Sequence, residues 1–87
     1  MYKEEITLLN QTGLHARPAS LFVKEASQYK SDIKVIKDGQ EYNGKSIMGI
    51  LSMGAGKGDV LTIQAQGEDE EKAVKNLVDL IANQLRD

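Results

Sequence analysis

Pro18 is the only proline of this 87-residue chain, and it limits where the first helix can begin. A proline has no backbone N–H, so a helix tolerates it in the first turn, where that group would have no partner. Apolar residues then recur at i, i+3, i+4 and i+7, which is one face of a helix. They are Ala19, Phe22, Val23 and Ala26. The sequence therefore predicts a helix that begins within one or two residues of His15 and runs to about residues 27–29.

The start of this helix carries basic side chains where acidic ones are usual. His15 is the only histidine and Arg17 follows it, although a basic group near a helix N-terminus costs roughly 0.3–1 kcal/mol. Residues 68–71, which open the last predicted helix, are all acidic. An anion bound at the first helix would explain the exception, because free amides and the positive dipole end attract it. The dipole also favours a neutral, nucleophilic imidazole.

We therefore expect an anion or phosphoryl site at His15, with donors from the Arg17 guanidinium. For a single histidine, the competing interpretation is a solvated side chain beside an unrelated arginine. No metal site is expected, because the chain has no second histidine and no cysteine to complete a ligand set. No cofactor site is expected either.

Composition indicates one small domain, residues 1–87, with 40% hydrophobic and 28% charged residues. The formal net charge of −2 gives no general attraction to nucleic acid. The absence of cysteine excludes disulfides and fits a cytoplasmic protein. We expect no membrane segment and no leader, because no apolar run approaches spanning length.

Alternating and turn-forming patterns predict four strands and three helices. The expected strands are residues 2–9, 33–36, 40–43 and 60–66. Asp38-Gly39 is a hairpin signal, and residues 10–13 form a turn-rich connection. A short helix at 47–53 and a last helix after Gly67 complete the order β-α-β-β-α-β-α. The apolar stripe of the last helix comprises Ala73, Val74, Leu77, Val78, Ile81 and Leu85. This order predicts an α+β open-faced β-sandwich, with helices on one face of a four-stranded antiparallel sheet.

The short helix is expected to leave apolar surface exposed beside His15. Ser46 is a plausible N-cap, and five apolar residues surround barely two turns of helix. A thin domain cannot bury every face, so we expect Met48 and Leu51 to be exposed, although all five could be core. A phosphate on the Ser46 hydroxyl would be stabilised by the end of this helix. Lys45 either helps to balance the charge of that phosphate or stays solvated.

Two motifs resemble the signatures of the HPr family, the histidine phosphocarriers of the bacterial sugar phosphotransferase system. Residues 12–19, TGLHARPA, resemble the active-site motif, and residues 45–54, KSIMGILSMG, resemble the regulatory-serine segment of Gram-positive members. The length and the order of elements also match over the whole chain. The resemblance implies the same open-faced sandwich.

The resemblance implies that His15 accepts a phosphoryl group at Nδ1 from phosphorylated enzyme I and donates it to sugar-specific IIA proteins. Arg17, with the amides of Ala16 and Arg17, would stabilise that group. The chain would be a monomeric, cytoplasmic phosphoryl carrier in sugar transport and not itself an enzyme. The expected partner contacts are Ala16, Ser20, Lys24, Ser27, Ile47, Met48 and Leu51.

The resemblance also implies that an ATP-dependent HPr kinase/phosphorylase modifies Ser46, in carbon catabolite regulation through a transcriptional regulator. Two other functions stay open. A purely regulatory HPr-like protein would act through phosphorylated Ser46, but such relatives typically lack the active-site histidine. A passive anion-binding module would form no covalent intermediate.

Overall fold

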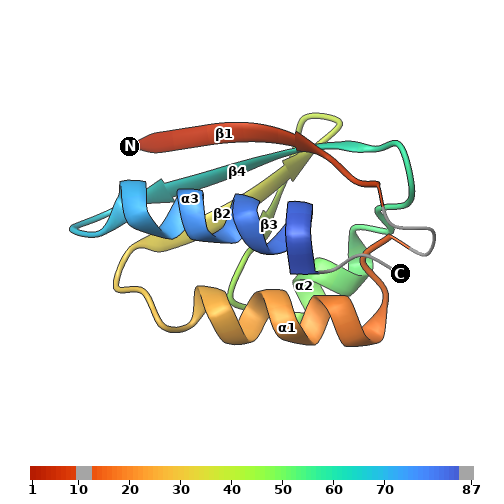
Figure 1. Cartoon of the computed structure of the whole chain (residues 1–87), viewed down its shortest axis with the longest axis horizontal. Coiled ribbons are helices and arrows are strands. Elements are labelled where there is room, and N and C mark those ends of the chain that lie inside the picture. The colour runs from red at the N-terminus through yellow and green to blue at the C-terminus, as the bar shows by residue number, and fades with distance from the viewer. Residues whose placement is uncertain (10–12, 85–87) are drawn as a thin grey trace.

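The computed structural model describes residues 1–9 and 13–84, and within them the predicted order of elements is confirmed (Figure 1). The strands are β1 (Tyr2–Thr7), β2 (Asp32–Lys37), β3 (Gln40–Asn43) and β4 (Val60–Gln66). The helices are α1 (Ala16–Ala26), α2 (Ile47–Ser52) and α3 (Glu70–Asp79), and α3 continues into the π-helical turn η1 (Leu80–Gln84). The predicted connection at residues 10–12 and the stripe residue Leu85 lie outside the described residues.

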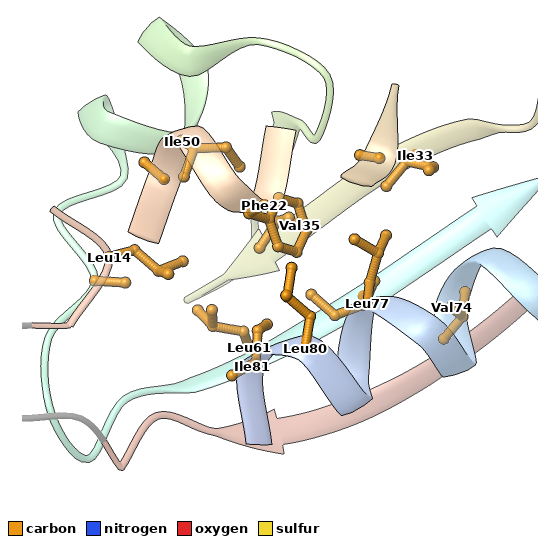
Figure 2. Packing of buried hydrophobic residues seen from close by; sticks show 14 of the residues in the cluster. Leu14, Phe22, Ile33, Val35, Ile50, Leu61, Val74, Leu77, Leu80 and Ile81 are labelled. Carbon is orange, nitrogen blue, oxygen red and sulfur yellow. The ribbon is translucent and has the colours of Figure 1, made fainter. Parts of the chain in front are cut away.

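The strands form one antiparallel sheet within the described residues, in the order β1-β4-β2-β3. Figure 1 shows the helices on one face of this sheet, which confirms the predicted open-faced sandwich. On the central strand β4, Leu61, Ile63 and Ala65 are fully buried and alternate with more exposed residues. In Figure 2, Phe22 from α1 lies beside Val35 from β2 in the same core.

The first strand is shorter than the alternation predicted. β1 ends at Thr7, although Leu8 continues the buried side and Leu9 is 63% exposed. The backbone of Leu8 pairs with a loop and not with a strand. Its amide donates to the Asp59 carbonyl at 2.9 Å, and its own carbonyl accepts from the Gly58 amide at 2.8 Å. The alternation of buried and exposed side chains therefore continues for two residues beyond the end of β1.

The hairpin between β2 and β3 forms where Asp-Gly predicted it. Both central residues lie in the left-handed region, Asp38 at φ 52° and Gly39 at φ 80°. Two such residues define the type I′ turn, whose twist suits a two-residue hairpin. Lys37 and Gln40 are then partners in register, and β3 becomes the edge strand next to α2 in the chain.

The sequence predicted Asp69 as one of the acidic residues that open the last helix, but its side chain has a different role. Asp69 is the N-cap of α3, but its side chain makes no capping hydrogen bond. The carboxylate instead accepts bonds from the Lys30 amide at 2.9 Å, the Ser31 amide at 3.0 Å and the Ser31 hydroxyl at 2.6 Å. Asp69 therefore joins the loop after α1 to the start of α3. Glu70 and Glu71 do lie in the first turn of α3.

Candidate functional site

His15 is the N-cap residue of α1. Its backbone is extended, at φ −91° and ψ −163°, and its carbonyl oxygen accepts the Ala19 amide at 2.9 Å as the helix begins. The side chain is exposed and makes no capping hydrogen bond among the described residues. The imidazole is therefore committed to no helix amide, and it is open to a partner from solvent.

Gly13 and Leu14 hold His15 against the loop that follows α2. Gly13 has φ 62°, and a Cβ atom there would stand 2.2 Å from the Ala55 carbonyl oxygen. The Leu14 amide donates to that same oxygen at 3.1 Å, and its side chain is buried in the core. Only glycine allows this approach of two backbone segments. The contact brings the loop after α2 next to the residue that precedes His15.

The first turn of α1 carries unbalanced positive potential. It contains no acidic residue, and Arg17 is exposed without a carboxylate partner within residues 1–9 and 13–84. Pro18, third in the helix, is buried as its first-turn position allows. The amides of Ala16 and Arg17 precede the first intrahelical donor, Ala19. These amides, the guanidinium and the His15 imidazole all belong to the N-terminal end of α1, which favours negative charge.

Ser46 is the N-cap of α2, as predicted. Its hydroxyl accepts the Gly49 amide at 3.1 Å, and its carbonyl accepts the Ile50 amide at 3.0 Å. The residue is half-buried. Because α1 packs against α2, and Figure 1 shows α2 beside the N-terminal end of α1, Ser46 and His15 belong to neighbouring elements.

Lys45 makes a contact that neither of its two predictions included. Its ammonium group donates to the Tyr29 carbonyl oxygen at 2.7 Å, and the side chain is half-buried. It is therefore not simply solvated. The contact joins Lys45 to the segment that follows α1.

The predicted exposure of Met48 and Leu51 is confirmed. Met48 is 76% exposed and Leu51 38%, while Ile47 is also exposed at 41%. We call Ile47, Met48 and Leu51 the apolar patch. The other two apolar residues of this segment, Ile50 and Met53, are buried in the core. The short helix therefore divides its apolar residues between core and surface.

The remaining predicted contact residues lie on α1 or at its end. Ala16, Ser20, Lys24 and Ser27 are all exposed, with Ser27 as the C-cap. The sequence prediction missed Leu21, an exposed leucine on the same helix. The sequence did contain a signal for this exposure. Leu21 comes two residues after Ala19, which places it off the apolar face of the helix.

The described residues contain no group of three or more His, Cys, Asp or Glu side chains placed to hold a metal ion. Among those residues, no helix has both the length and the apolar character needed to cross a membrane.

Comparisons with known proteins find similar proteins over most of the chain. A family model described as "PTS HPr component phosphorylation site" matches residues 2–83. The phosphocarrier protein HPr of Neisseria meningitidis serogroup A is 44% identical over 81 residues, covering 93% of this chain and 91% of that protein. The HPr-like protein Crh of Bacillus subtilis is 46% identical over 77 residues, covering 88% and 91%.

Solved structures match the fold closely. HPr-C-His from Thermoanaerobacter tengcongensis has a TM-score of 0.91 at 54% identity, covering 94% of this chain and 92% of that one. An HPr dimer from the same organism has a TM-score of 0.79 at 52% identity, covering 94% of each chain.

Proposed function

This chain belongs to the HPr family of the phosphotransferase system, and on that premise we propose that it carries a phosphoryl group on His15. A ring nitrogen of His15 forms a bond to phosphorus while the bond from phosphorus to enzyme I breaks. A sugar-specific IIA protein then takes the group in the same way. The resemblance to HPr favours Nδ1 as the attacking nitrogen. The observation that carries this proposal is an exposed N-cap imidazole without a capping bond, at a helix end without acidic residues.

Arg17 and the first amides of α1 hold the phosphoryl charge. Arg17 follows Ala16 and is exposed, and its guanidinium offers several hydrogen-bond donors in a fixed plane. The Ala16 and Arg17 amides add fixed dipoles that need no reorganisation when the charge arrives. The chain thus acts as a carrier that stabilises its own covalent phosphoryl intermediate. The enzymes of the transfer reaction are its partners.

Mass spectrometry of the intact protein tests the carrier function. After incubation with phosphoenolpyruvate and purified enzyme I, the wild-type chain should gain one phosphoryl group, labile in acid and stable in base. His15→Ala should gain none while its circular dichroism spectrum stays unchanged, because the exposed side chain makes no capping bond. Phosphorylation of His15→Ala by enzyme I at the normal rate would refute the carrier function.

The apolar patch and the exposed face of α1 form the docking surface. Flexible methionine side chains adapt to several partners, and an exposed apolar patch favours association. Met48, with Ile47 and Leu51 around it, supplies the apolar part. Ser20 and Lys24 of α1 and its C-cap Ser27 are exposed and supply a polar rim, and Ala16 is an exposed small residue at the start of the helix. Enzyme I, IIA proteins and the HPr kinase/phosphorylase would share this surface.

Ser46 is the regulatory site of this proposal. An ATP-dependent HPr kinase/phosphorylase would modify it, and a catabolite-control transcriptional regulator would read the product. The N-cap position supports this, because the end of α2 accommodates negative charge. The alternative is a purely regulatory protein that acts through phosphorylated Ser46. One relative of this chain is named HPr-like protein Crh. His15 favours the carrier, and the enzyme I experiment separates the two.

We further propose that residues 1–87 act as one domain, cytoplasmic and monomeric. Because a solved structure of the HPr from Thermoanaerobacter tengcongensis is a dimer, the oligomeric state of this chain has to be measured. Sedimentation equilibrium at several concentrations distinguishes monomer from dimer. A concentration-independent dimer would contradict the monomer.

A further inference from the structure

The loop between β3 and α2 is held by polar contacts from each of its residues. The Gly44 amide donates to the Ile33 carbonyl at 2.8 Å, which extends the β2–β3 pairing past the end of β3. The Lys45 amide donates to the side-chain oxygen of Asn43 at 2.9 Å. The Ser46 amide donates to the Asn43 carbonyl at 3.2 Å. Three consecutive amides of this short loop therefore have acceptors before α2 begins.

Lys45 also attaches this loop to a distant part of the chain. Its ammonium group contacts the Tyr29 carbonyl at 2.7 Å, across 16 residues of sequence. Tyr29 is well fixed, because its side chain is only 8% exposed. The Tyr29 hydroxyl donates to Glu25 of α1 at 2.5 Å and accepts from Asn76 of α3 at 2.7 Å. Tyr29, which accepts the Lys45 hydrogen bond, is therefore itself hydrogen-bonded to both long helices, α1 and α3.

We propose that Asn43 and Lys45 form a clamp that positions the Ser46 hydroxyl for phosphorylation, with Lys45 acting through the Tyr29 carbonyl. This inference rests on the proposed regulation of Ser46. In that step the Ser46 oxygen bonds to the γ-phosphorus of ATP and the bond to ADP breaks. The hydroxyl proton leaves to a base on the kinase. The Gly49 amide occupies one lone pair of the Ser46 oxygen at 3.1 Å and leaves the other for attack.

A clamp matters because α2 is too short to fix its own first residue. Helix formation has a costly nucleus, and six residues gain few internal hydrogen bonds. The bonds from Gly49 and Ile50 to Ser46 therefore need support from contacts outside the helix. A reacting group held in the productive geometry removes an entropic cost from the reaction. A neutral carbonyl engaged by Lys45 fits this positioning function better than charge compensation at Ser46.

Lys45→Met tests the clamp, because it keeps most of the aliphatic stem and removes the donor. The kcat/KM for Ser46 phosphorylation by an ATP-dependent HPr kinase should fall about tenfold, equivalent to about 1.4 kcal/mol. Lys45→Arg keeps a donor and should recover much of the rate. Lys75→Met removes the same charge from an exposed position on α3 and should leave the rate unchanged. Asn43→Ala should act like Lys45→Met without any change of charge, while Asn43→Asp keeps the acceptor and the rate.

Amide hydrogen exchange of the free protein separates positioning from a direct contact with the kinase. Lys45→Met should accelerate exchange at Lys45, Ser46 and Gly49 in the absence of any partner. A slower kinase reaction with unchanged exchange would overturn the clamp, since Lys45 would then touch the kinase itself. Wild-type rates in Lys45→Met and Asn43→Ala would also overturn it. If the wild-type chain were not phosphorylated at Ser46, the proposed regulation would be lost, and the exchange measurement would still decide the clamp.

Discussion

At the scale of single residues, His15 and Arg17 are an exposed imidazole and an exposed cation at the start of α1, and we propose them as the nucleophile and the phosphoryl-stabilising group. Arg17 has no carboxylate partner among residues 1–9 and 13–84, and it lies within the first turn of α1. A guanidinium in this position opposes the helix dipole by roughly 0.3–1 kcal/mol. Its presence therefore fits the proposed phosphoryl group at His15 better than a contribution to stability.

Arg17→Glu should consequently separate function from folding. The substitution places an acidic residue at a helix N-terminus, so the free energy of unfolding should rise by a few tenths of a kcal/mol. Phosphoryl transfer from enzyme I should slow by about tenfold or more, because a donor is lost and a repelling charge is gained. Rapid-quench kinetics and urea denaturation measure the two effects. Unchanged transfer kinetics would make Arg17 an ordinary surface residue.

Gly13 and Gly54 provide a matched pair for the backbone contact behind His15. Their φ angles are almost equal, 62° and 66°, but a Cβ atom at Gly54 would meet nothing within 4 Å. Gly54→Ala should therefore cost only the left-handed backbone, about 1 kcal/mol. Gly13→Ala should cost about 3 kcal/mol, because its Cβ also overlaps the Ala55 carbonyl. Urea denaturation of both variants checks this, and equal losses would show that the loops separate easily.

At the scale of elements, the local patterns predicted most of what forms. The bounds of β3 and β4 agree with the alternation and with the Asp38-Gly39 turn, because both signals lie within a few residues. The Ser46 cap was predictable for the same reason. The end of β1 was not, since it depends on Leu8 pairing with a loop 50 residues later in the chain, at Gly58. Likewise, no local pattern indicated that Lys45 reaches Tyr29.

Ser46→Asp tests whether α2 can carry charge without losing its fold. Aspartate caps helices well, so the circular dichroism spectrum and the free energy of unfolding should change little. The added charge next to the apolar patch should lower the rate of His15 phosphorylation by enzyme I about tenfold, through altered complementarity with the partner. Ser46→Ala, which removes the cap without adding charge, should cost about 1 kcal/mol of stability and leave the transfer rate near normal.

Equal efficiency of Ser46→Asp and wild type with enzyme I would leave Ser46 as a cap without an inhibitory role. A large loss of helix signal in Ser46→Asp would instead attribute any inhibition to unfolding.

At the scale of the whole molecule, the proposed phosphoryl site and the Asp69 contact lie at opposite ends. Figure 1 shows the loops that carry Ser31 and Asp69 at the end away from the first turn of α1. That end is held by three hydrogen bonds from residues 30 and 31 to the Asp69 carboxylate. Gly67 approaches Ser31 so closely that a Cβ atom would lie 2.7 Å from its hydroxyl oxygen. The sequence places these residues almost 40 positions apart, so only the folded topology reveals the contact.

This contact should make the stability of the protein depend on pH in acid. The hydrogen bonds, first that from the Ser31 hydroxyl and then that from the Lys30 amide, lower the pKa of Asp69 from 3.8 to about 2. A group with a lowered folded-state pKa stabilises the fold fully above its unfolded pKa, and that stabilisation is lost as pH falls towards the folded value. Wild type should therefore be more stable than Asp69→Asn near neutral pH, and the difference should shrink between pH 3.8 and about 2.

Thermal unfolding of both proteins over this pH range measures the difference. NMR titration of the Asp69 carboxyl in Ser31→Ala supplies the control, because losing the strongest of these bonds should raise its pKa towards 3.8. Phosphoryl transfer at neutral pH should stay near normal in Asp69→Asn, since the start of α1, which His15 caps, lies at the other end of the molecule. A stability difference that stays constant from neutral pH down to pH 2 would mean that the Asp69 carboxylate does not hold these two loops together by its charge.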